Sequence, residues 1–156
     1  MKRFLFILAF AIMCQQSLTA QEGLRVGGHL GIPVGDASDF TSLTLGGDIT
    51  YLWQVTEMLA VGASSGFGIY LGKDDYSNYS FIPLAVSGRV SYPENWFYVA
   101  DIGYALALED GADGGFYIQP KIGYTTGSLD IFIYYQNISE NGASIASFGA
   151  GIAFPL

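Results

Sequence analysis

Apolar and polar residues alternate along nearly the whole chain after residue 20. In the segment 96–108, Trp96, Tyr98 and Ile102 fall on one face, and Asp101 and Gly103 fall on the other. A period of two is typical of β-strands whose two faces meet different environments. No helical pattern competes with it after residue 20. The alternation predicts eight strands, near residues 24–33, 42–53, 58–71, 81–92, 96–108, 115–124, 129–138 and 145–155.

The connections between these expected strands alternate in length. In an up-and-down meander, every second connection lies at the same end, so the short turns share one end and the longer loops share the other. Transmembrane β-barrels have this arrangement and an even number of strands. Strands of about ten residues also match the length that a tilted strand needs to cross a bilayer. The short connections are 54–57, 93–95 and 125–128, and the longer ones, rich in Gly, Asp, Ser and Asn, are 34–41, 72–80, 109–114 and 139–144.

Large apolar residues share one face of each expected strand, and small or polar residues share the other. In a soluble lipocalin-like barrel the large residues would point inward, leaving an exterior of mostly Gly, Ser and Ala that water hydrates poorly. The reverse arrangement places the large residues against lipid and the small ones in the narrow lumen that eight strands enclose. Closure also pairs the backbone N–H and C=O groups, as lipid requires. The pattern therefore favours an all-β fold: an eight-stranded antiparallel up-and-down transmembrane β-barrel.

Aromatic residues gather near both ends of the expected strands. Amphipathic rings prefer the level of the lipid headgroups, so two aromatic belts are expected on a membrane barrel. The belt beside the short turns comprises Tyr51, Trp53, Tyr92, Trp96, Tyr124 and Phe154, and the belt near the longer loops comprises Phe67, Phe81, Tyr104, Phe116 and Tyr135.

The first twenty residues have the pattern of a secretory signal peptide. Basic Lys2 and Arg3 precede the apolar stretch 4–13, and small Ala20 follows at the expected cleavage point. The apolar stretch is too short for a spanning helix. Acylation at Cys14 is the alternative, but it needs a small residue where Met13 stands. We therefore expect residues 1–20 to be removed and residues 21–156 to form the exported barrel, without cysteine.

Composition and charge narrow the class of protein further. The chain is 51% hydrophobic and only 13% charged, whereas soluble domains carry about a quarter charged residues. The formal net charge of −8 becomes −10 once Lys2 and Arg3 are removed. A chain this acidic has no basic patch to neutralise phosphates, which excludes nucleic-acid binding.

Three of the four basic residues that remain fall on the inward face, each near an acid. A buried charge persists only when it is paired and hydrogen-bonded. We therefore expect three charge pairs to plug the lumen and fix the register. Hairpin symmetry predicts the partners: Arg25 opposite Asp48, Arg89 opposite Asp101, and Lys121 diagonally beside Asp130.

Most other acidic residues lie on the side of the longer loops, where Lys73 is the basic residue. Loops rich in Asp and Gly offer hard oxygen ligands, which makes divalent cations or cationic partners one hypothesis. The twelve-residue calcium-loop pattern is absent, and solvated acidic loops are common, so the hypothesis remains an alternative. The acids concerned are Asp36, Asp39, Asp74, Asp75, Glu109, Asp110, Asp113 and Glu140.

The sequence offers little catalytic chemistry. His29 is the only histidine, and a hydrolytic triad with Asp48 and either Ser64 or Ser147 is conceivable. However, His29 is expected inside the barrel in the middle of a strand, where a hydrogen-bonded structural histidine is the ordinary case. The sequence contains no phosphate loop, nucleotide fingerprint or metal-ligand spacing. We expect no enzyme activity, cofactor or metal.

Two segments carry a resemblance to a known family. The first loop reads Gly-Ile-Pro-Val-Gly-Asp over residues 31–36, and residues 113–124 read DGGFYIQPKIGY. In these segments and over the whole of residues 21–156, the chain resembles the small single-domain outer-membrane β-barrels of Gram-negative bacteria, of the OmpA/OmpX type. The resemblance implies location in the outer membrane and contact with the barrel-assembly machinery, which reads a terminal aromatic residue. Here Phe154 is followed by Pro155 and Leu156.

We therefore expect a non-enzymatic integral outer-membrane protein with a structural or surface-interaction role in the cell envelope. A narrow conduit for small molecules is the first alternative. A lipid-modifying enzyme that depends on His29 and a soluble secreted barrel are the others.

Overall fold

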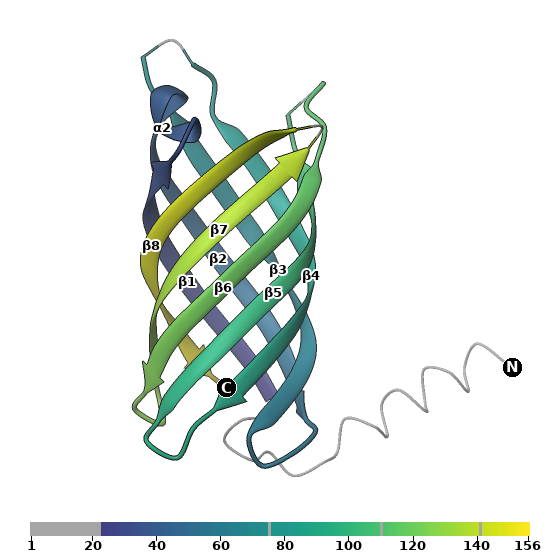
Figure 1. The fold of residues 1–156 in the computed structure, drawn as a ribbon, viewed down its shortest axis with the longest axis vertical. Helices are drawn as coiled ribbons and strands as arrows, with labels where there is room; N and C mark the ends of the chain where they lie inside the picture. Colours follow the sequence, from purple (N-terminus) through teal and green to yellow (C-terminus); the bar gives the residue numbers. More distant parts are fainter. Residues whose placement is uncertain (1–22, 75, 110, 141) are drawn as a thin grey trace, which may run out of the picture.

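The computed structural model describes residues 23–74, 76–109, 111–140 and 142–156, except the side chain of Glu140. It is a closed barrel in which each strand pairs with the next and β8 pairs with β1. Figure 1 shows the tilted strands, with α2 at one end and the chain's C-terminus at the other. The expected signal peptide, residues 1–20, lies outside the described residues. The strands are β1 (Gly23–Val34), β2 (Thr41–Gln54), β3 (Leu59–Gly72), β4 (Tyr79–Ser91), β5 (Trp96–Ala107), β6 (Gly115–Thr125), β7 (Asp130–Glu140) and β8 (Ala143–Pro155).

The predicted antiparallel meander is confirmed, and each strand lies within two residues of the predicted bounds. All neighbouring strands are antiparallel. The connections 55–58, 92–95 and 126–129 form the short-turn end, and the connections at the opposite end, the loop end, include 35–40, 73–78 and 108–114. In the described residues, no helix is long and apolar enough to cross a membrane.

The loop end differs from the prediction in two places. The expected loop 139–144 is wrong because Glu140 still pairs with Ala143, which makes the β7–β8 connection a tight hairpin. The first loop contains a short helix, α2 (Ala37–Phe40), which the alternation did not predict. A helix this short leaves no periodic signal in the sequence. Hydrogen bonds tether it: the Lys73 ammonium group donates to the Ser38 carbonyl oxygen over 2.6 Å, and the Lys73 N–H donates to the Phe40 carbonyl oxygen.

The two faces of the wall have opposite chemistry. Val86 is 68% exposed and Ile32 is 60% exposed, whereas Asp101 and Gln119 inside the barrel are at most 1% exposed. Large apolar side chains therefore cover the exterior, and charged and amide side chains fill the lumen. This is the reverse of a soluble barrel, in which the apolar groups would be inside.

Most of the aromatic residues expected on the exterior are exposed there, including Trp53, Trp96 and Phe116. Phe81 is an exception, because it is 1% exposed and packs inside the lumen against Tyr70 and Tyr117. Its place in the alternation of β4 is the inward one, so its assignment to an outer belt was wrong.

Candidate functional site: the charged lumen

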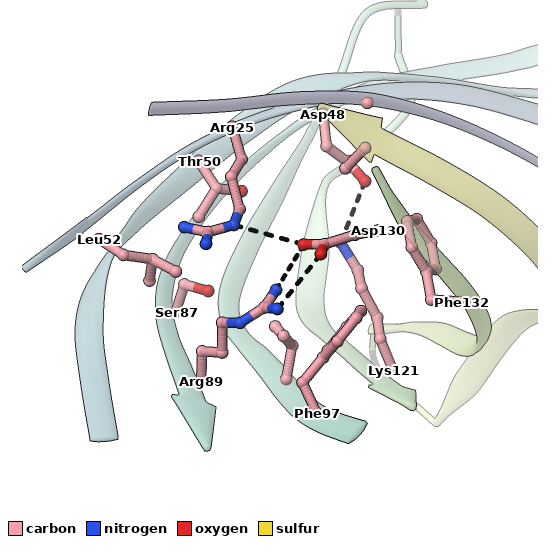
Figure 2. Close-up of a pocket in the computed structure, with 13 residues that line it drawn as sticks. Arg25, Asp48, Thr50, Leu52, Ser87, Arg89, Phe97, Lys121, Asp130 and Phe132 are labelled. Carbon is pink, nitrogen blue, oxygen red and sulfur yellow. Dashed lines mark hydrogen bonds and ion pairs between the residues drawn. The ribbon is translucent and has the colours of Figure 1, made fainter. Parts of the chain in front are cut away.

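Three charged residues from separate parts of the wall meet near the short-turn end. Asp130 of β7 accepts two hydrogen bonds from Arg89 of β4, at 2.6 Å for Nη1–Oδ2 and 3.3 Å for Nη2–Oδ1. Arg25 of β1 also contacts Asp130, with 3.3 Å between its Nε and Oδ2. Figure 2 shows Arg89 directing its two terminal nitrogens at the carboxylate, which Arg25 approaches through Nε. We call Arg25, Arg89 and Asp130 the Asp130 cluster.

Neighbouring side chains hold Arg89 in this geometry. Its Nε donates to the Ser91 hydroxyl over 3.2 Å, and its guanidinium carbon lies 3.8 Å from the ring centroid of Phe97. A cation over an aromatic face is attracted by the ring quadrupole, more strongly away from water. Arg89 is therefore anchored on both its polar edge and its flat face.

A second group of charges lies beside the first. The Lys121 ammonium group of β6 lies 3.0 Å from an oxygen of Asp48 on β2 and 3.0 Å from an oxygen of Asp101 on β5. His29 of β1 joins through its Nδ1, 3.2 Å from Asp48 Oδ2. We call His29, Asp48, Asp101 and Lys121 the Lys121 cluster. Together the two clusters take charged side chains from six of the eight strands, so they cross the whole lumen.

The six predicted charges are thus inside, but their partners differ from the prediction. In the structure Arg25 lies opposite Thr50, and Arg89 lies opposite Val99. Lys121 lies opposite Tyr134, and its acids are Asp48 and Asp101. Each hairpin is shifted by two residues from the expected register. Such a shift keeps every side chain on its own face, so the hydrophobic pattern cannot detect it. Across a narrow lumen, long side chains also reach strands that are not neighbours.

The space between the two clusters is small. A cavity of about 40 Å³ lies among them, lined in part by Thr50, Ser87 and Phe132. Ser87 lies directly opposite Asp101 in the β4–β5 ladder. Ser87 Oγ and Asp101 Oδ1 are buried and have no hydrogen-bond partner among the described residues. This volume accommodates about three water molecules, and no organic solute.

A chain of neutral hydrogen bonds lies nearer the loop end. The Tyr117 hydroxyl donates to Gln119 over 2.8 Å, and Gln119 donates to Gln136 over 3.3 Å. Gln136 donates to the Tyr70 hydroxyl over 2.9 Å, which donates to the Ser147 hydroxyl over 3.3 Å. The chain joins β6, β7, β3 and β8 and forms a second layer in the lumen. These residues were missed because neutral side chains have no charge to pair, although each occupies an inward position in the alternation.

The geometry around His29 does not support a hydrolytic triad. A Cβ placed on Gly46 would lie 2.3 Å from His29 Nε2, so backbone covers the nitrogen that a nucleophile would need. The Ser147 hydroxyl is instead bonded to Tyr70. Among residues 23–74, 76–109, 111–139 and 142–156, no three His, Cys, Asp or Glu side chains are placed to hold a metal ion.

The acidic residues of the loop end are spread over several loops. Asp36, Asp39, Asp74 and Asp113 are exposed. Glu109 is half-buried and accepts the Ser80 N–H over 2.7 Å. Asp75, Asp110 and the side chain of Glu140 lie outside the described residues, so the hypothesis of cation binding stays a prediction.

Comparison with known proteins identifies the fold and no more than the fold. No protein-family model matches the chain, and no curated protein matches it. The solved structures that share its architecture include a de novo designed transmembrane β-barrel (TM-score 0.60, 15% identity, 90% of this chain and 100% of that one). They also include Ail, the attachment invasion locus protein of Yersinia pestis (TM-score 0.58, 10% identity, 86% of this chain and 99% of that one). A further one is the N-terminal barrel domain of Pseudomonas aeruginosa OprF (TM-score 0.54, 12% identity, 86% of this chain and 98% of that one). The chain therefore has the eight-stranded transmembrane barrel fold, and the resemblance to the OmpA/OmpX type is confirmed at that level.

Proposed function

We propose that this protein is an integral protein of a bacterial outer membrane that acts through its barrel and its loop end, without catalysing a reaction or conducting solutes. The observation that carries the proposal is the closed lumen. The Asp130 and Lys121 clusters cross the barrel, and the cavity between them is about 40 Å³. The neutral chain that ends at Tyr70 and Ser147 adds a second layer.

Location in the outer membrane is supported by the surface and by the similar structures. The exterior carries large apolar side chains such as Leu30, Val86 and Ile102. Ail and the OprF domain are outer-membrane barrels with the same fold. By analogy with such barrels, the short-turn end would face the periplasm and the loop end the exterior. The exposed acids of the loop end make it the surface for interactions, with cationic groups as the favoured partners.

The first test is the mobility of the full chain on a denaturing gel, boiled against unboiled, from a washed outer-membrane fraction. A closed barrel should resist cold detergent and shift on heating. Recovery of the protein in the soluble periplasm would contradict the proposal and would mean that the apolar exterior is covered by something other than lipid.

The second test is conductance in a planar bilayer. The wild-type barrel should give no steady unit conductance. A porin of about sixteen strands, whose lumen is an aqueous channel, is the positive control that shows that the assay detects an open barrel. Steady conductance of the wild type would favour the conduit instead. Altered envelope lipids that depend on His29 would favour an enzyme.

A further inference from the structure

The backbone ladder between β6 and β7 is interrupted at the middle of both strands. Pairing runs as far as Ile118 with Asn137 and resumes at Lys121 with Tyr134, so two steps are missing. Pro120 lies in the interruption, and proline has no N–H to donate to a neighbouring strand. On its other side, β6 pairs with β5 without a break. The missing N–H of Pro120 therefore accounts for a local gap in the β6–β7 wall.

The lumen side of this gap is closed by side chains. Gln119 and Gln136 occupy the first missing step, and their amide groups are hydrogen-bonded over 3.3 Å. Tyr117 and Tyr70 hold the two amides from either side. A bond between side chains thus stands where backbone bonds are lost, and it keeps the gap from opening into the lumen.

The outer side of the gap is an apolar groove of about 300 Å³. Its lining is almost entirely carbon, which suits hydrocarbon and offers no group to a charged ligand. Lys121 and Tyr134 also line it, although their side chains take part in contacts inside the lumen. The residues of the outer face that form this Pro120 groove are Tyr98, Pro120, Ile122, Ile133, Tyr135 and Phe148.

A second proline lies in another interrupted ladder. The β3–β4 ladder stops at Ser65 with Leu84 and resumes at Gly68 with Phe81, and Pro83 lies in the break. A hollow of about 390 Å³ lies beside this second gap and includes Ser65 and Leu84. That hollow is lined by paired residues of β1 to β4 and does not contain Pro83. The Pro120 groove, in contrast, contains the proline of its own gap.

The depth of the Pro120 groove restricts what can fill it. Pro120 is the middle residue of β6, and Tyr135 is the middle residue of β7. The hydrocarbon core of a bilayer is about 30 Å thick, so strands that span it carry their central residues near its midplane. Headgroups do not reach that depth. The groove therefore meets acyl chains or another protein.

We propose that the Pro120 groove binds one acyl chain of a membrane lipid as a retained ligand, distinct from the exchanging lipid around the barrel. A second copy of the chain fits the observations less well, because a stable protein interface takes about 20–30 residues from each partner, whereas six outward residues of β5 to β8 form this groove. The inference rests on membrane insertion, which belongs to the proposed function and is tested separately by the gel assay.

The test measures quenching of tryptophan by a phosphatidylethanolamine that carries bromine at the middle of one acyl chain. The native tryptophans are first replaced, Trp53→Phe and Trp96→Phe. One reporter is Phe148→Trp, at the edge of the groove, and the matched control is Ile102→Trp, exposed near the middle of β5 and outside the groove. The folded full-length barrel in detergent micelles is titrated with the brominated lipid.

Quenching at the Phe148→Trp reporter should saturate near one lipid per barrel, whereas the control should rise in proportion to the lipid in the micelle. Pro120→Val restores an N–H to the ladder, and Ile122→Phe fills the groove, so both should abolish the saturable component. Val86→Phe enlarges an outward residue outside the groove and should leave it unchanged.

Three results would overturn the inference. Equal dependence on lipid at both reporters would show exchanging lipid alone. If saturable quenching persists in Pro120→Val, lipid binding does not depend on the gap in the β6–β7 ladder. If the emission of the Phe148→Trp reporter changes with protein concentration and not with lipid concentration, a second copy of the chain occupies the groove. Each variant is first required to shift between unboiled and boiled gels, so loss of folding or of membrane insertion is recognised separately from loss of lipid binding.

Discussion

Arg89 and Asp130 join opposite parts of the barrel through two hydrogen bonds, although β4 and β7 are not neighbours in the sheet. A pair between adjacent strands would stabilise one hairpin, whereas this pair stabilises the closed cross-section. The Asp130 carboxylate also contacts Arg25 of β1, so three strands depend on one residue. Removing one partner of a buried ion pair is strongly destabilising because the remaining charge is uncompensated.

Asp130→Ala should therefore lower the free energy of unfolding by about 3–5 kcal/mol. Arg89→Ala should cost less, because Asp130 keeps its contact with Arg25. Lys73→Ala in an exposed loop should change stability by about 0.5 kcal/mol or less. Urea unfolding in detergent micelles, followed by tryptophan emission, measures all three. Equal losses for Arg89→Ala and Lys73→Ala would show that the charged lumen does not stabilise the barrel.

The strands and their faces could be predicted from the sequence because the membrane imposes a strict rule. A strand that meets lipid on one face and the lumen on the other must alternate, as Trp96 to Ala107 does. Charged residues on the inward face, such as Asp101 and Lys121, could be assigned to the lumen for the same reason. An unpaired charge is costly in lipid, so a charged residue on the inward face of the alternation is expected in the lumen.

The contacts within the lumen could not be predicted. Register depends on turn geometry, and a shift of two residues leaves the alternation unchanged. Lys121 therefore contacts Asp48, 73 positions away in the sequence, instead of Asp130. The hydrogen bond between Gln119 and Gln136 carries no sequence signal either. The two amides meet because β6 and β7 pair in the register of Ile118 with Asn137, which the alternation does not determine.

The assignment of the lipid face predicts the effect of a charge placed on it. Ala100 is exposed on the exterior of β5. Ala100→Arg should cost about 2–4 kcal/mol if the position is near the bilayer midplane. Ala107→Arg at the loop end of the same strand should cost less, because its inward side chain can extend toward water. Unfolding in lipid vesicles measures both, and the reverse order would mean that the faces are wrongly assigned.

The Lys121 cluster requires a glycine beside its histidine. A Cβ on Gly46 would lie 2.3 Å from His29 Nε2, and His29 is held by Asp48 and by an edge contact with Tyr134. Gly46→Ala should therefore displace the imidazole and cost about 1–3 kcal/mol through overpacking. Gly28→Ala is the matched control, because its Cβ would meet its nearest atom at 3.6 Å, an ordinary contact. Nuclear magnetic resonance of the imidazole protons, together with unfolding, checks both; an unmoved His29 resonance in Gly46→Ala would contradict the prediction.

The bridge between Gln119 and Gln136 predicts a particular non-additivity. Gln136→Leu leaves the buried amide donor of Gln119 without its acceptor, which should cost about 1–3 kcal/mol. Gln119→Leu likewise removes the acceptor of the Tyr117 hydroxyl. In the double variant the orphaned amide is gone, so the loss should be smaller than the sum of the two single losses, by about 0.5–3 kcal/mol. Urea unfolding of the wild type, the two single variants and the double variant measures this double-mutant cycle. Additive losses would mean that the two amides do not act together across the gap at Pro120.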